Sequence, residues 1–196
     1  MTITKEIKVS RLRLNKRILE LKKNFSFKQS KDGPTRKQQD KLRGFVLLCH
    51  AELESYFENV ATLLINNAYT LWRNKKISNY NLTCFLLRYK NKPTKPLKVD
   101  CEIFETKKNF INDISNNHGV KGDNIHKLFN CLGYNDDDFS VTLISELSSL
   151  GVSRGEIAHL SSYKATSLLD KLTIYSQIDR IMDELDGFEE CILSKL

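Results

Sequence analysis

Apolar side chains recur every three or four residues over long parts of the chain, and this spacing marks the buried face of an amphipathic α-helix. The longest stripe runs from Leu42 to Leu71 and predicts a helix over residues 36–72. Similar stripes predict a first helix over residues 5–25 and a last long helix over residues 166–195. We expect the helix over 36–72 to be the spine of the fold.

Shorter helical patterns fill the segment between the long helices. Residues 101–117 predict a helix, with an inward face made of Phe104, Ile111 and Ile114. A second short helix is expected near Asp123, whose side chain is a candidate N-cap. The acidic run at residues 136–138 is expected at the start of a further helix, where the helix dipole favours negative charge. Because no segment alternates as a strand does, the sequence predicts an all-α bundle with two long helices and several short ones.

The length of 196 residues suits one domain, so residues 1–196 are expected to form a single unit. Residues 1–35 contain a basic N-terminal helix in this interpretation. Residues 73–98 are also basic, and two prolines among their lysines favour an exposed loop or insertion.

Positive charge is concentrated in the first half of the chain. Residues 1–98 hold 22 Lys and Arg against 7 Asp and Glu, a net charge of +15. Residues 99–196 hold 9 against 17, a net charge of −8. Such an asymmetry suits a polyanionic partner such as RNA, because basic side chains release counterions from a phosphate backbone. A solvated basic face explains the charge equally well.

Several classes of protein and site lack support in the sequence. No apolar run is long enough to span a bilayer or to serve as a secretion signal, so we expect a cytoplasmic protein that does not contact a membrane. The five cysteines are scattered without a C-x-x-C pair, which favours thiols in a reducing compartment. Metal-binding motifs and a glycine-rich phosphate loop are both missing, so we expect neither a metal nor a cofactor.

The segment SRGEIAH places Arg154 five residues before His159 and offers chemistry that needs no metal. In RNA the ribose 2′-OH can attack the adjacent phosphate if a base, an acid and a cation assist. A histidine exchanges protons near neutral pH, and an arginine fork suits phosphate oxygens. On a regular helix, however, side chains five residues apart diverge by about 140°. The two converge only if the helix ends or distorts between them, which the polar residues after His159 allow.

The same residues resemble a known family. Arg154 and His159 match the R-x4-6-H motif of the HEPN superfamily, whose domains are all-α bundles and often metal-independent ribonucleases. LRGFVLLCHAELESYFENVA (42–61) and NNHGVKGDNIHKLFNCLGY (116–134) are similar to segments of the RiboL-PSP-type branch. The resemblance implies that Arg154 and His159 are the catalytic pair. It also implies a homodimer in which two motifs face one shared cleft.

Two departures from the family pattern stand near the motif. The position after the arginine is often polar in this superfamily, and here it is Gly155. Members controlled by a nucleotidyltransferase carry a tyrosine two residues after the histidine, and here that position is Ser161. The first departure leaves room for an inactive domain, and the second puts that mode of control in doubt.

Further polar residues are candidates for supporting roles. His50 and Glu54 lie one helical turn apart and face the same way. Asn117, His118 and Lys121 form a polar group before a glycine that could bind phosphate, although a structural turn explains them more simply. Glu156 could pair with Arg154 or face solvent. His126 is expected at the surface without a partner.

Together these observations predict a metal-independent HEPN endoribonuclease that binds RNA. The resemblance implies a toxin or an anti-phage (abortive infection) effector, held in check by an antitoxin or another regulatory protein. An inactive HEPN module that binds RNA or a protein is the alternative. A purely structural helical adaptor is a third possibility.

Overall fold

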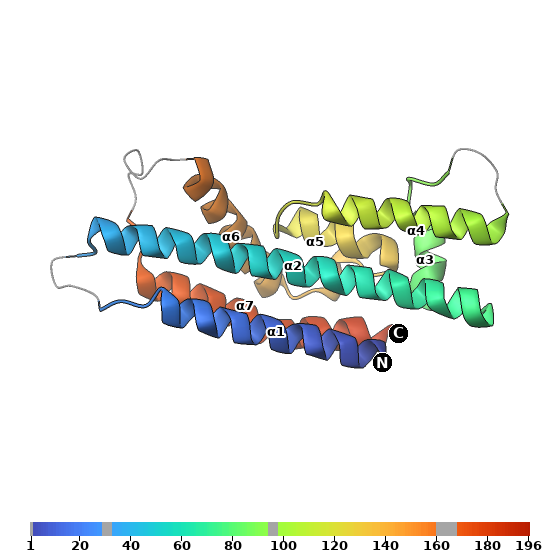
Figure 1. The fold of residues 1–196 in the computed structure, drawn as a ribbon, viewed down its shortest axis with the longest axis horizontal. Coiled ribbons are helices and arrows are strands. Elements are labelled where there is room, and N and C mark those ends of the chain that lie inside the picture. Colours follow the sequence, from blue (N-terminus) through green and yellow to red (C-terminus); the bar gives the residue numbers. More distant parts are fainter. Residues whose placement is uncertain (1, 29–32, 94–97, 160–167) are drawn as a thin grey trace.

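A computed structural model describes residues 2–28, 33–93, 98–159 and 168–196. Within these ranges all regular structure is helical, which confirms the all-α class (Figure 1). The α-helices are α1 (Ile3–Asn24), α2 (Arg36–Lys75), α3 (Tyr80–Arg88), α4 (Val99–Ser115), α5 (Gly122–Phe129), α6 (Val141–His159) and α7 (Lys171–Ser194). Two 3-10 turns, η1 (Asn130–Leu132) and η2 (Asp136–Asp138), join α5 to α6.

The long helices α1, α2 and α7 run side by side along the long axis of the molecule (Figure 1). At one end α6 leans across them, and at the other end α3, α4 and α5 form a second group. Helix α2 contacts each of the other six α-helices, as expected of the spine of the fold.

Local sequence explains the limits of α2. Thr35 and Gln38 form a reciprocal capping box, in which each side chain accepts a hydrogen bond from the other residue's backbone N–H. At the other end Lys76 adopts a left-handed conformation with φ 56°, which stops the helix. The expected helix over 36–72 is therefore confirmed and continues for about one further turn.

A buried polar network ties α1 to α2 and α7. Arg11 is 9% exposed, donates to the carbonyl oxygen of Met182 and lies 3.6 Å from the carboxylate of Glu189, measured from Nε to Oε1. The hydroxyl of Tyr56 donates to the same carboxylate at 2.7 Å. One cation and one phenol thus compensate a carboxylate that burial would otherwise disfavour.

The basic segment at 73–98 is more than a loop. It contains α3, in which Leu82 and Phe85 are fully buried, and the amide of Asn81 donates to the carbonyl oxygen of Leu132 at 2.9 Å. The expectation was an exposed loop or an insertion; an exposed loop does not describe the segment, because these apolar residues anchor it in the core, and the insertion stays a prediction. Residues 94–97, which include Pro96, lie outside the described part.

The buried face of α4 differs from the expected one. Phe104 is 43% exposed, and Ile111 is half-buried. Ile114 is buried as predicted, but its buried neighbours on the helix are Ile103, Thr106 and Phe110. The helix is therefore rotated relative to the prediction, and Phe104 packs its ring 6.0 Å from that of Tyr69 at the edge of the bundle.

Two expected helix starts are also corrected. Lys121 is the N-cap residue of α5, and Asp123 lies inside its first turn. The acidic run forms the separate turn η2, closed by a hydrogen bond of 2.6 Å from the backbone N–H of Asn135 to Asp138. α6 begins only at Val141. The acidic residues therefore close a turn of their own before α6.

The last helix is shorter than expected. α7 begins at Lys171, where Asp170 caps the backbone N–H of Thr173 at 2.8 Å, and Leu168 before it is 72% exposed. The predicted stripe is confirmed farther along, with Ile178, Leu185, Phe188 and Ile192 buried.

Candidate functional site

Helix α6 carries both residues of the motif and is continuous from Val141 to His159. The helix ends at His159, as expected, but it does not distort between Arg154 and His159. Positions five residues apart on a regular helix diverge by about 140°. His159 is the last residue of α6, and its side chain lies outside the described part, as do residues 160–167.

Arg154 is exposed, and its positive charge affects the pKa of the buried imidazole of His50 on α2. His50 is 4% exposed, and burial lowers its pKa from the usual value. The carboxylate of Glu54, 3.9 Å from His50 Nδ1 and one turn along α2, raises this pKa, whereas the positive charge of Arg154 lowers it further. Burial is the largest of the three effects, so His50 is a neutral imidazole in the fold at neutral pH.

Glu54 also holds the loop between α4 and α5. Its carboxylate accepts a hydrogen bond from the backbone N–H of Gly119, a residue whose φ of +128° suits glycine. The neighbouring His118 is exposed, and its charge lowers the pKa of Glu58, which burial raises. The loop therefore brings His118 to the same part of α2.

The start of α5 lies close against α6. The backbone N–H of Gly122 donates to Ser148 Oγ at 3.1 Å. A Cβ atom at Gly151 would lie only 2.6 Å from Cγ of Lys121, so the lysine side chain packs directly over this glycine. The side chain of Lys121 therefore packs against α6 about one turn before Arg154.

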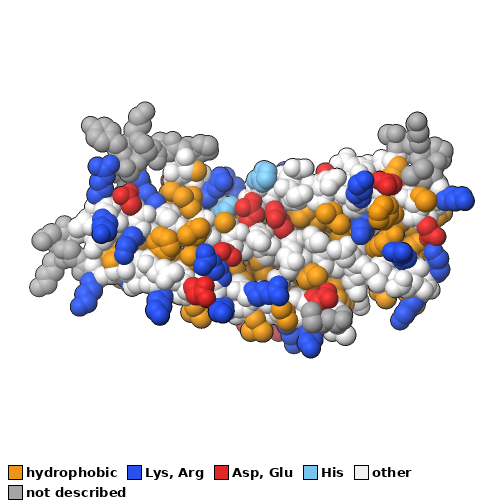
Figure 2. Space-filling model, in the orientation of Figure 1, with side chains coloured by type: hydrophobic (Ala, Val, Ile, Leu, Met, Phe, Trp, Pro, Cys, Tyr) orange, Lys and Arg blue, Asp and Glu red, His pale blue; other side chains and the backbone are white. Residues whose placement is uncertain are grey.

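Five side chains from three segments therefore form what we call the α2–α6 cluster: His50, Glu54, Glu58, His118 and Arg154. Figure 2 shows acidic and histidine side chains gathered near the middle of the visible face. The cluster combines a permanent cation, a neutral imidazole, two carboxylates and an exposed histidine. Such groups can hold a phosphate and exchange protons with it.

The other predicted residues have different surroundings. The amide of Asn117 donates to the carbonyl oxygen of Asn124 at 3.2 Å and accepts from the Asn124 amide at 3.2 Å, so its role is to shape the loop. Glu156 is exposed, and in the described part of the chain it forms no ion pair with Arg154. Glu58 was missed by the sequence reasoning, although its position one turn after Glu54 on the same helix face was a usable signal.

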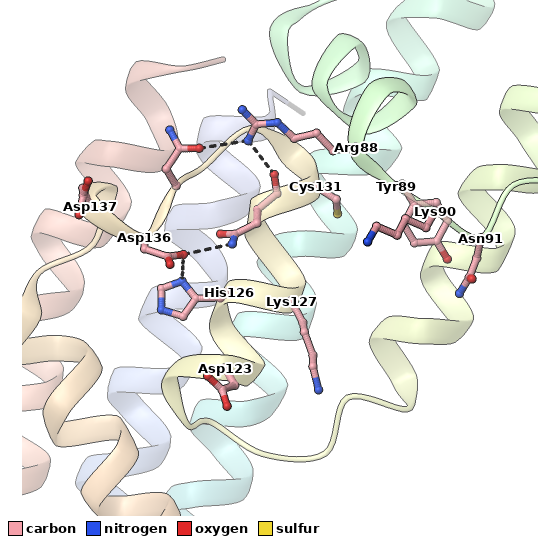
Figure 3. A pocket seen from close by; sticks show the side chains of 12 residues that line it. Arg88, Tyr89, Lys90, Asn91, Asp123, His126, Lys127, Cys131, Asp136 and Asp137 are labelled. Carbon is pink, nitrogen blue, oxygen red and sulfur yellow. Dashed lines mark hydrogen bonds and ion pairs between the residues drawn. The ribbon is translucent and has the colours of Figure 1, made fainter.

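A large hollow lies on the far side of α5 from α2 (Figure 3). It has a volume of about 1080 Å³ and is bounded by the end of α3, by α5 and by η2. Inside it Nδ1 of His126 lies 2.5 Å from a carboxylate oxygen of Asp136. The expectation that His126 has no partner is therefore wrong, because η2 returns an acidic side chain to α5.

Neither a metal centre nor a membrane span is found in the part of the chain that the structure describes. Among these residues, no three His, Cys, Asp or Glu side chains gather where they could hold a metal ion. Across the same residues, no helix combines the length and the apolar character that crossing a membrane requires.

The lowered pKa of His50 predicts a loss of stability in mild acid. The unfolded chain binds a proton near the usual pKa of about 6.5, whereas the folded chain binds it only at lower pH. The melting temperature should therefore fall as the pH decreases from about 7 to about 5. His50→Gln, which stays neutral, should show a smaller fall over the same range. An equal fall in both proteins would show that His50 does not carry this effect.

Substitution of Gly155 is expected to increase the stability of the fold. A Cβ atom there would meet nothing within 4 Å, and the residue lies inside α6. Gly155→Ala should raise the free energy of unfolding by about 1 kcal/mol, because alanine restricts the unfolded chain more than glycine does. Gly151→Ala is the matched control on the same helix, since its Cβ atom would displace Lys121. Equal stabilisation by both substitutions in a thermal melt would contradict this account.

Comparison with known proteins gives one match. The family model of RiboL-PSP-HEPN matches residues 12–192, a range that includes α2, α6 and every residue of the α2–α6 cluster. No curated protein and no solved structure matches the chain.

Proposed function

Because this chain belongs to the RiboL-PSP-HEPN family, we propose that it is a metal-independent endoribonuclease with Arg154 and His159 as its catalytic pair. Membership of the family by itself implies a ribonuclease that acts on RNA. The observation that best supports the specific proposal is the position of the motif arginine. The charge of Arg154 on α6 lowers the pKa of the buried imidazole of His50 on α2, and His118 acts on the pKa of Glu58 two turns farther along α2.

The proposed reaction is an internal displacement at phosphorus. A histidine takes the proton of the ribose 2′-OH, whose oxygen attacks the adjacent phosphate. The bond from phosphorus to the 5′-oxygen breaks, and an acid protonates the leaving oxygen. The products are a 2′,3′-cyclic phosphate and a 5′-hydroxyl. Arg154 would stabilise the additional negative charge on the phosphate oxygens, since a guanidinium keeps its charge and donates two parallel hydrogen bonds.

The continuous α6 favours a homodimer in this proposal. Within one helix the positions of Arg154 and His159 diverge, so a second copy of α6 is the simplest source of a histidine facing Arg154. His159 would then be the acid or base across a shared cleft. His118 would assist from the loop, with Lys121 close to the phosphate.

In this proposal the supporting residues place the reacting side chains and do not themselves transfer protons. Glu54 holds Gly119 and so places His118, while His50 fills the space beneath Arg154 without adding a positive charge. Glu156 and Asn117 would lie outside the chemistry, at the surface and in the loop.

The biological role that we propose is that of a toxin or an anti-phage effector, restrained by an antitoxin or another regulatory protein. An RNA-cleaving enzyme of this kind should stop growth when it is expressed alone. Growth of cells that express His159→Ala at the same level provides the comparison. Arrest by both proteins would point to a cause other than cleavage.

The test of the activity is cleavage of single-stranded RNA by the purified protein in EDTA. We expect wild-type activity to persist in the chelator and to leave 5′-hydroxyl ends that polynucleotide kinase can label without prior phosphatase treatment. Loss of cleavage in EDTA, or 5′-phosphate ends, would refute the proposed chemistry.

A catalytically inactive HEPN module that binds RNA or a protein is the second candidate. Gly155 favours it, because the position after the arginine lacks the polar side chain that is frequent in the superfamily. The excess positive charge of residues 1–98 would serve RNA binding in either case. Salt-dependent RNA binding without any cleavage by the wild-type protein would favour this candidate.

A further inference from the structure

The hollow beside α5 adjoins a second one that lies against the end of α4. The second hollow has a volume of about 360 Å³, and Tyr89 and Lys127 line both. It extends to Asn116 and Asn117, which directly precede His118. We call the two hollows together the α5 groove. It leads from η2 across α5 to the end of α4, where the loop that carries His118 begins.

Asparagine side chains are unusually frequent along this groove. Four of them are fixed to the fold through one end of the amide: Asn91, Asn116, Asn130 and Asn135. In the described part of the chain the other end of each amide has no hydrogen-bond partner. Oδ1 of Asn130 is buried as well as unpartnered. The free amide ends of the exposed Asn91, Asn116 and Asn135 therefore offer donors and acceptors that are held in place before any ligand arrives.

Charge is distributed unevenly between the walls of the groove. Figure 3 shows Lys90 on one side and Asp136 and Asp137 on the other, and the guanidinium of Arg88 is bonded to η1 and to the residue before η2. Asp136 is already engaged by His126 at 2.5 Å and by the Asn130 amide at 3.1 Å. Lys90 and Lys127 are exposed, and within the described ranges neither forms an ion pair. One wall is thus able to bind phosphates while the other offers hydrogen-bond acceptors.

We propose that the α5 groove binds single-stranded RNA next to the cleaved bond, an inference that rests on the proposed ribonuclease function. The phosphates would follow Lys90 and Lys127. The bases would turn toward the amides and carboxylates, which accept hydrogen bonds from base amino and imino groups. Proteins recognise RNA sequence mainly in single strands, because only unpaired bases expose these edges.

The polar walls argue against a duplex as the ligand. In a duplex the Watson–Crick edges are occupied, so the fixed amides would lose their partners, and a second phosphate backbone would meet Asp123 and Asp137. The open groove also exceeds what one nucleotide needs, since small-molecule pockets of about 300–1,000 Å³ enclose whole drug-sized ligands. A strand of several nucleotides would run along the groove from η2 to Asn116.

The test measures binding separately from cleavage. A fluorescent single-stranded RNA of about twelve nucleotides is titrated into full-length His159→Ala protein, which should not cut it, and anisotropy is recorded at several salt concentrations. The double variant Lys90→Gln/Lys127→Gln should bind about tenfold more weakly, and the slope of log affinity against log salt should become shallower by about 1.4. Lys16→Gln on α1, which is exposed and distant from the groove, is the control and should bind as before.

Three outcomes would overturn the inference: unchanged affinity in the double variant, equally tight binding of a duplex of the same sequence, or competition by a mononucleotide at the same concentration as the oligonucleotide. The two proposals can fail separately. Weakened RNA binding by the lysine variant, together with no cleavage by wild type, would support RNA binding in the groove and refute the nuclease function. RNA cleavage by wild type, together with unchanged binding by the lysine variant, would support the nuclease function and refute RNA binding in the groove.

Discussion

Replacing Arg154 by alanine is expected to lower kcat/KM for RNA cleavage by about 10²- to 10³-fold, which corresponds to a loss of about 3–4 kcal/mol of transition-state stabilisation. The phosphate gains negative charge as the 2′-oxygen attacks, and alanine leaves that charge without its cation. The substitution should hardly change the melting temperature, because Arg154 is exposed. Single-turnover cleavage and a thermal melt on the same preparation measure both quantities.

Two further variants sharpen this prediction. Arg154→Lys keeps the charge but loses the planar fork, so activity between those of wild type and alanine is expected. Arg73→Ala removes an exposed arginine near the end of α2, far along the helix from His50, and should leave cleavage unchanged. Full activity of Arg154→Ala, or an equal loss in Arg73→Ala, would exclude a specific role of Arg154 in the transition state.

Replacing Arg11 by alanine should reduce the free energy of unfolding by about 3 kcal/mol, because it leaves the carboxylate of Glu189 in a mostly buried site without its cation. For a chain of this length the melting temperature should fall by about 10 °C. Arg13→Ala removes an exposed arginine from the same helix and should cost little. Chemical denaturation of both variants provides the free energies.

A second substitution tests the cause of that loss. Adding Glu189→Gln to Arg11→Ala removes the unpaired charge, so the double variant should be more stable than the sum of the two single losses predicts. Strict additivity would mean that Arg11 stabilises the protein through packing of its stem alone.

The frame of the fold could be predicted because its helices are long. In α2 the apolar stripe repeats over many turns, so single exceptions do not obscure the period. α3 was missed because its apolar run is short and is flanked by lysines and prolines, which are typical of a loop. The rotation of α4 escaped prediction because Thr106 is buried while the aromatic Phe104 is not.

The candidate site was predictable only in part, and for a related reason. Spacing along one helix is enough to place His50 beside Glu54. The contact between Glu54 and Gly119 joins residues far apart in sequence and depends on the left-handed loop, which no local pattern encodes. The pair of His126 and Asp136 likewise depends on two 3-10 turns that reverse the chain.

The contacts of α2 with all other helices have a mechanical consequence for the α2–α6 cluster. Amides in the middle of α2 can exchange with solvent only when most of the protein unfolds, whereas amides near a helix end exchange through local opening. His50 and Glu54 therefore stand on the helix that contacts all six other α-helices, while Arg154 stands within the last two turns of α6. We therefore expect local opening to move Arg154 without moving His50 and Glu54, so that in the proposed reaction the arginine can adjust to a bound phosphate.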